Sequence, residues 1–166
     1  NKPTFNADLP LPAELPAGLS VQITDKWLVA FDYNHAYWTV YKTLMVNFAN
    51  GIVSNNPRNY KDASTYRIGT QYKMNQKFVF RAGWYFDESP VQDGYFAPET
   101  PRNDSMGFTG GLTYQITPKF GIDASFLYLH FNETNSSYNY ADEEGRPYSF
   151  GGTYKNVVFS PGVGLT

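Results

Sequence analysis

The sequence contains no cysteine, which excludes disulfides, zinc–thiolate sites and cysteine nucleophiles. Histidine is almost as scarce: His35 and His130 are the only two, too few for a histidine-based metal cluster. No apolar run reaches the roughly 18 residues that a transmembrane helix needs. The formal net charge of −2 gives no basic signature, so we expect no nucleic-acid partner.

Aromatic side chains are abundant instead. There are 14 Tyr, 13 Phe and 3 Trp, which make up 18% of the 166 residues. The mean hydropathy is negative, and a negative value usually indicates a soluble protein. That inference fails for membrane barrels, because their strands alternate between lipid-facing and water-facing residues. The spacing of the aromatic residues therefore decides the class.

The segment FGIDASFLYL, residues 120–129, alternates between two kinds of side chain. Apolar residues such as Phe126 fall on one face of an extended strand, whereas Asp123 and Ser125 fall on the other. The same alternation recurs in residues 78–87, where Phe80 and Arg81 take opposite faces. The pattern predicts strands with one apolar face and one polar face.

Three segments resemble one another: VQITDKWLV at 21–29, YKMNQKFVF at 72–80 and YQITPKFGI at 114–122. Each joins two strands through a tight turn that contains Asp25, Asn75 or Pro118. Long polar links lie between these hairpins, at 49–62, 87–104 and 132–153. Short turns alternating with long loops are typical of outer-membrane barrels, whose short turns are periplasmic.

These signals predict an all-β fold, a transmembrane antiparallel β-barrel. Residues 1–14 form an entry segment, and residues 15–166 supply the strands and loops. We expect seven strands, at about 15–24, 26–47, 63–74, 77–87, 105–117, 119–131 and 155–166. A soluble sandwich is the alternative, but it leaves the sorting of the loops by length unexplained.

In the barrel, the aromatic face meets outer-membrane lipid and the polar face lines the lumen. The lumen-facing charges are Arg67, Arg81, Asp32 and Asp123. Bacterial single-chain barrels have even strand numbers, and an open sheet edge cannot be left in lipid. We therefore expect further strands from an N-terminal part of a longer protein or from another chain.

The segment YKDASTYRIGTQYKMNQKFVFRAGWYFDESPV, residues 60–91, resembles the FadL/TodX (OMPP1) family of bacterial outer-membrane transporters. The most specific motif is Phe86-Asp87-Glu88-Ser89-Pro90-Val91; LPAELPAGLS at 11–20 and AYWTVYKTL at 36–44 are also similar to the family. The resemblance implies a 14-stranded barrel with an N-terminal plug, of which this chain is the C-terminal half. It also implies passive transport of long-chain fatty acids or other hydrophobic molecules. A non-transporting structural or complex-forming barrel is the alternative.

Four residues are candidates for substrate contact. Leu127 and Leu129 follow Asp123 on the lumen face, so an apolar patch is available to an acyl chain, or to a plug or a folded-in loop. The resemblance also implies a basic residue in the loop before residue 62, where Arg58 and Lys61 lie. Either could bind a fatty-acid carboxylate, or be a solvated extracellular charge.

We expect neither catalysis nor a cofactor. No G-x-S-x-G or matched Ser/Asp arrangement accompanies the two histidines. The acidic run Asp142–Glu144 lacks the spaced ligands of a calcium loop and is interpreted as a solvated loop tip, so no metal site is expected.

Overall fold

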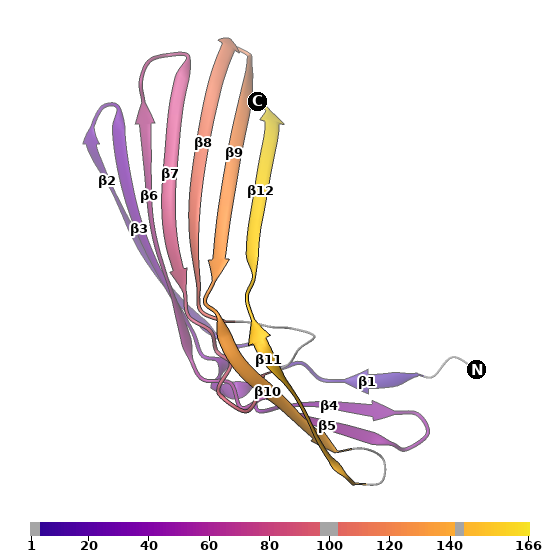
Figure 1. Ribbon diagram of the computed structural model, residues 1–166. Helices are drawn as coiled ribbons and strands as arrows, with labels where there is room; N and C mark the ends of the chain where they lie inside the picture. Colours follow the sequence, from indigo (N-terminus) through magenta and orange to yellow (C-terminus); the bar gives the residue numbers. More distant parts are fainter. Residues whose placement is uncertain (1–3, 97–102, 142–144) are drawn as a thin grey trace.

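The computed structural model describes residues 4–96, 103–141 and 145–166 (Figure 1). Within these ranges the chain consists of β-strands, their connections and one short 3-10 helix, η1 (Trp38–Val40). The acidic run Asp142–Glu144 lies outside the described residues. No helix in these ranges is long and apolar enough to cross a membrane.

Seven antiparallel strands form the main sheet, in the order β12-β9-β8-β7-β6-β3-β2. They are β2 (Glu14–Thr24), β3 (Trp27–Ala36), β6 (Ala63–Lys73), β7 (Phe78–Asp87), β8 (Ser105–Thr117), β9 (Phe120–Phe131) and β12 (Val157–Leu165). Six of the seven predicted strands agree with these bounds to within two residues. Most are far longer than the 5–6 residues of ordinary globular strands and suit the roughly 9–11 that cross a bilayer.

The predicted strand 26–47 is wrong as one continuous strand: it is interrupted after Ala36, and residues 43–47 belong to a separate strand, β4 (Thr43–Phe48). β3 ends at Ala36 because its partner β6 begins at Ala63, the residue paired with it. Asp62 then accepts the Thr39 amide hydrogen on its carboxylate, at 2.9 Å, and the chain turns aside through η1. Beyond Ala36, β3 has no neighbouring residue of β6 to pair with.

Two smaller sheets lie at the end of the main sheet that carries the long connections (Figure 1). One joins β1 (Phe5–Ala7), β4 (Thr43–Phe48) and β5 (Val53–Pro57), and the other is the hairpin β10 (Thr134–Ala141) with β11 (Pro147–Tyr154). The expectation of plain loops at 49–62 and 132–153 is therefore wrong in part. Strand pairing at the long-loop end uses polar and glycine residues, such as Ser137 opposite Gly151.

Three short turns close the other end of the main sheet. In two of them the residue after the turn centre, Lys26 or Lys119, donates its amide to a threonine hydroxyl two residues earlier, at 3.3 Å. Both of these turns follow a register shift in the preceding strand. In the third, Asn75 Oδ1 accepts the amides of Lys77 at 2.8 Å and Phe78 at 3.0 Å. Polar side chains thus fix each tight turn, as the sequence pattern predicts.

The main sheet has no apolar core. Among the described residues, the buried apolar side chains are Ala36, Tyr41, Ala63, Pro90 and Phe96. These five lie at or beyond the long-loop end of the sheet. On the central strands, by contrast, aromatic side chains are open: Phe108 is 50% exposed and Phe126 is 45% exposed. This arrangement is the reverse of a soluble sandwich, in which the aromatic face of each sheet would be covered.

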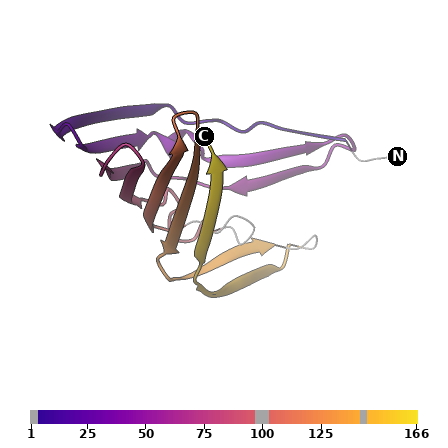
Figure 2. The same ribbon diagram turned by 90° about the horizontal axis from the view of Figure 1, so that it is seen from above.

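The two edge strands run in the same direction. β2 starts opposite Ala36 at the long-loop end, and β12 finishes opposite Ile122 at the short-turn end, so each runs from the long loops toward the short turns. The sheet curves but does not close on itself (Figure 2). Both edges therefore remain available for pairing with further strands.

Candidate functional site on the concave face

A hollow of about 730 Å³ lies on one face of the main sheet. Residues from five neighbouring strands, β3, β6, β7, β8 and β9, line it, so it occupies the inside of the curve (Figure 2). Its lining includes the charged residues Asp32, Arg67, Arg81 and Asp123, together with apolar residues such as Leu28 and Ala30. We call this surface the concave face. The four charges predicted to face the lumen all line this hollow.

A chain of polar contacts crosses the concave face near the short turns. The Arg81 guanidinium donates to Gln71 Oε1 at 2.9 Å and to Thr113 Oγ1 at 2.7 Å. Thr113 in turn donates its hydroxyl hydrogen to Asp123. Arg81 and Asp123 are therefore linked through a threonine and not by a direct ion pair. The contacts join β6, β7, β8 and β9 side to side.

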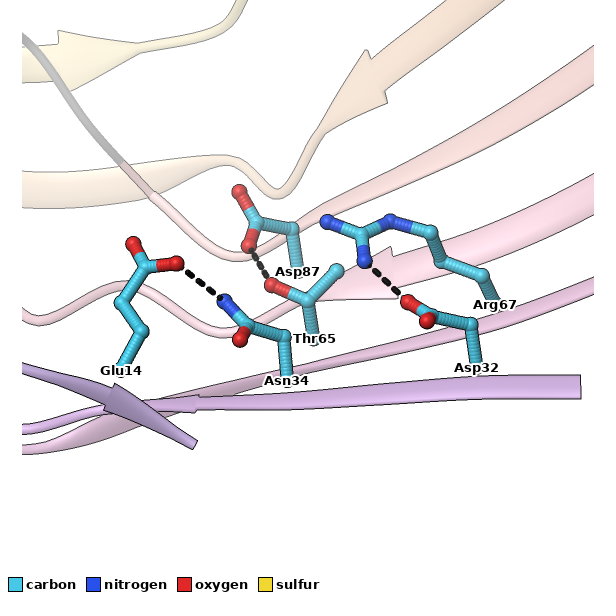
Figure 3. A network of polar contacts seen from close by, with 6 residues as sticks. All are labelled: Glu14, Asp32, Asn34, Thr65, Arg67 and Asp87. Atoms are coloured by element: carbon cyan, nitrogen blue, oxygen red, sulfur yellow. Dashed lines mark hydrogen bonds and ion pairs between the residues drawn. The ribbon is translucent and has the colours of Figure 1, made fainter. Parts of the chain in front are cut away.

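A second polar group lies at the long-loop end of the same face (Figure 3). Arg67 forms an ion pair with Asp32, and Thr65 donates to Asp87 at 2.6 Å. Asn34 donates to Glu14 at 3.3 Å. A smaller cavity of about 360 Å³ opens among these strands. Most charges that face the lumen are thus held by a neighbouring polar group.

One row of paired residues on the concave face changes from charged to apolar. The row runs Asp32, Arg67, Tyr85, Gly107, Leu129 and Val158, with each residue directly opposite the next. The Tyr85 ring lies across Gly107, where a Cβ atom would overlap the ring. Glycine is required here because the aromatic side chain lies flat on the neighbouring strand. The result is a wall with an ion pair at one side and an apolar surface at the other.

Leu127 and Leu129 lie on the concave face of β9, both half-buried. Leu127 is opposite Thr109 and Ser160, and Leu129 is opposite Gly107 and Val158. Their neighbours on the adjacent strands are therefore small or apolar. Their role as a substrate contact stays a prediction.

The structure separates the two basic candidates from these leucines. Arg58 is buried at the end of β5 and donates its amide to Lys42 O at 2.7 Å. Lys61 is exposed and donates its amide to Pro90 O at 2.9 Å. Both belong to the connection between β5 and β6, beyond the main sheet. The four predicted residues therefore lie in two different parts of the fold, and a role for Arg58 or Lys61 stays a prediction.

Sequence reasoning missed a cluster on the outer face at the long-loop end. His35 Nδ1 lies 2.9 Å from Ser64 Oγ, and the Tyr33 hydroxyl lies 3.2 Å from the same oxygen. The Ser64 amide donates to Glu88 at 2.9 Å. Histidine and serine are far apart in sequence, and only the register of β3 on β6 places them opposite each other. Ser64 is buried beneath the rings, so the cluster fastens two strands at the aromatic rim.

The convex face carries the apolar set of each strand. Its exposed members include Leu19, Val21, Phe31, Ile68, Phe80, Phe108, Phe126 and Phe159. An apolar surface of this extent is not left in water by soluble proteins. With a polar, hydrogen-bonded concave face behind it, this surface defines the sheet as part of the wall of a membrane-spanning β-barrel. The predicted fold class is confirmed.

Comparison with known proteins gives the family. Residues 3–165 match the family described as outer membrane protein transport protein (OMPP1/FadL/TodX), and the chain belongs to it. It is 28% identical over 142 residues to the 47 kDa outer membrane protein of Pasteurella multocida, covering 85% of this chain and 32% of that protein. It is 25% identical over 145 residues to the long-chain fatty acid transport protein of Escherichia coli O6:H1, covering 83% of this chain and 32% of that protein. The resemblance and the outer-membrane location are confirmed.

Solved structures of other proteins share the fold of this chain. The sheet superposes on a Pseudomonas aeruginosa FadL homologue with a TM-score of 0.84, at 22% identity, covering 97% of this chain and 37% of that chain. The CymD monoaromatic hydrocarbon channel matches with a TM-score of 0.62 at 30% identity, covering 77% of this chain and 33% of that chain. The chain thus spans about a third of the length of the relatives that it matches.

Proposed function

We propose that the chain is the C-terminal half of a closed barrel that passively carries long-chain fatty acids or other hydrophobic molecules across the outer membrane. The observation that supports this most is the row from the Asp32–Arg67 ion pair to Leu129 and Val158. A lumen for ions would gain nothing from an apolar wall. An amphiphilic molecule, in contrast, can place its polar end beside charges and its chain against the leucines.

The direction of the edge strands restricts how the barrel closes. β2 and β12 run the same way, so a barrel with only antiparallel neighbours needs an odd number of additional strands. Two copies of this chain in one orientation would place β12 of one beside β2 of the other in parallel. We therefore favour a different segment with an odd number of strands, such as the seven that would precede these in a 14-stranded barrel.

The polar groups of the concave face favour a transport path in which no reaction is catalysed. Arg81, Thr113 and Asp123 satisfy one another, and Arg67 is paired with Asp32. Within the described part of the chain, no group of three or more His, Asp or Glu could hold a metal ion. We propose a non-enzymatic role in which these residues shape the lumen and hold water against the charged part of its wall.

The test is uptake by the full-length protein that contains this chain. A cell that lacks its own fatty-acid transporter is given this protein, and uptake of labelled oleate is measured. Leu127→Asn together with Leu129→Asn should lower uptake severalfold, because each methylene that leaves water contributes about 0.8 kcal/mol to substrate binding. Ser125→Asn, on the same strand face, is the matched control and should leave uptake unchanged.

Two results would contradict the proposal. Absence of oleate or toluene uptake by the folded parent protein would favour a structural barrel without transport. Normal uptake by the folded double-leucine variant would assign the two leucines to packing against a plug or loop. Heat-modifiable gel migration identifies the folded fraction in each case.

A further inference from the structure

An apolar groove of about 560 Å³ lies on the convex face, opposite the lumen. Its floor is the pair Thr70 and Ala82, directly opposite each other on β6 and β7, with glycine backbone beside them. Trp27 and Val29 of β3 form one wall, and Ile68 and Trp84 form the other. Bulky side chains flank small ones, so the groove is a shallow, open depression in the lipid-facing surface.

The polar atoms of two side chains of the groove, Trp27 and Thr70, are hydrogen-bonded. Trp27 Nε1 donates to Thr70 Oγ1 at 2.7 Å, and Thr70 Oγ1 donates to Leu28 O at 3.0 Å. The Trp27 indole N–H and the Thr70 hydroxyl are therefore hydrogen-bonded to each other and to the backbone. What remains for an occupant is almost entirely apolar surface, which suits a hydrocarbon chain better than a sugar or a peptide.

The depth of the groove places it in one leaflet. Thr70 and Ala82 lie three or four residues from the ends of their strands at the short turns, about 10–13 Å at about 3.3 Å per residue. Half of a bilayer's hydrocarbon core is about 15 Å. The groove therefore lies within the leaflet next to the short turns, with its Trp27 end toward the headgroups.

The short turns next to that end of the groove carry positive charge. The turns that follow β2 and β6 touch: the Lys73 amide donates to Lys26 O at 2.7 Å, and Lys26 Nζ donates to Met74 O at 3.5 Å. These two turns carry Lys26 and Lys77, both exposed, against the single acid Asp25, whereas Lys73 at the end of β6 falls on the concave face of its strand, opposite Val79. An anionic headgroup is the complement of this cluster.

We propose that the groove and the lysines of these short turns form a binding site for an anionic phospholipid of the leaflet on the short-turn side. One acyl chain lies in the groove between Trp27 and Trp84, and the phosphate lies at Lys26 and Lys77. The site faces outward, so it is separate from the lumen and does not depend on what the barrel transports.

Bromine-labelled acyl chains test this, because bromine quenches tryptophan fluorescence on contact. The full-length barrel is placed in phosphatidylcholine vesicles with about a tenth of the lipid replaced by brominated phosphatidylglycerol or, in the other arm, brominated phosphatidylcholine. The signal of the groove is the difference between the parent protein and Trp27→Phe/Trp84→Phe. One lysine near an anionic headgroup is worth about a fivefold preference and two about thirtyfold, so phosphatidylglycerol should be enriched at the groove by that order.

Two pairs of variants separate headgroup from chain. Lys26→Gln/Lys77→Gln should abolish the preference, whereas Lys119→Gln, on the third short turn, should keep it. Ala82→Leu fills the floor and should lower quenching by both lipids severalfold. Ala124→Leu, on the same face of β9 and outside the groove, should not change it. Only the folded fraction, identified by gel migration, is compared.

Several outcomes would overturn the proposal. Equal quenching by the two lipids would show that the lysines do not select an anionic headgroup. Unchanged quenching in Ala82→Leu would show that the acyl chain does not lie in the groove. If oleate displaced the brominated lipid, the groove would belong to the transported substrate. If neither lipid quenched the two tryptophans, a second protein surface would cover them.

Discussion

The concave and convex faces of the main sheet share one backbone and differ in how their side chains are satisfied. On the concave face, Arg81 contacts Gln71 and Thr113, and Thr113 contacts Asp123, so polar groups bond to one another across strands. On the convex face, Phe108 and Phe126 are about half exposed and have no covering layer. The convex face is therefore suited to contact with lipid outside the barrel, and the concave face is suited to contact with water in the lumen.

A charge moved between the faces should give the largest effect. Phe126 on the convex face and Thr109 on the concave face lie at adjacent levels of neighbouring strands. Arg at the lipid-facing midplane costs about 2–4 kcal/mol, whereas lumen positions tolerate charge. We expect Phe126→Arg to lower the free energy of unfolding of the full-length barrel by that amount and Thr109→Arg to change it little.

Urea titration of the barrel in vesicles measures both variants, with tryptophan fluorescence as the signal. A loss of stability in Thr109→Arg that exceeds the loss in Phe126→Arg would reverse the assignment of the two faces.

Glycine substitution should give the next largest change in stability, and the change should again differ between the two faces. Gly107 lies under the Tyr85 ring, and a Cβ there would overlap it, whereas a Cβ at Gly110 on the convex face meets nothing within 4 Å. Gly107→Ala should cost about 1–3 kcal/mol through overpacking. Gly110→Ala should be neutral or stabilising by about 0.5–1 kcal/mol, since glycine weakens a strand.

The double variant Gly107→Ala/Tyr85→Ala supplies the control for this pair. It removes the ring that the new methyl would strike, so the two changes should be less than additive in unfolding experiments. Additive losses would mean that the ring does not rest on Gly107 in the membrane.

The sequence could predict the faces and the short turns because both are local. Alternation from Phe120 onward sets the two faces of β9, and Asn75 is a turn residue with its own hydrogen bonds. The end of β3 at Ala36 could not be predicted, because it depends on where β6 begins, more than twenty residues later. The contact of His35 with Ser64 and the Tyr85–Gly107 stack depend on register in the same way.

The ion pair in the lumen should give the smallest effect, and its size reports how wet the concave face is. The side chains of Arg67 and Asp32 are 48% and 45% exposed. A pair this open is worth about 0.2–1 kcal/mol, because water screens the charges. A double-mutant cycle with Asp32→Asn and Arg67→Gln should therefore give a coupling energy in that range, smaller at high salt than at low salt. Breaking a pair in a dry interior would cost about 3–5 kcal/mol, so a coupling of that size, independent of salt, would mean that the closed lumen excludes water beside Arg67. The lipid-facing and lumen-facing sides would then both be dry, and the polar contacts of the concave face would hold the barrel together instead of facing water.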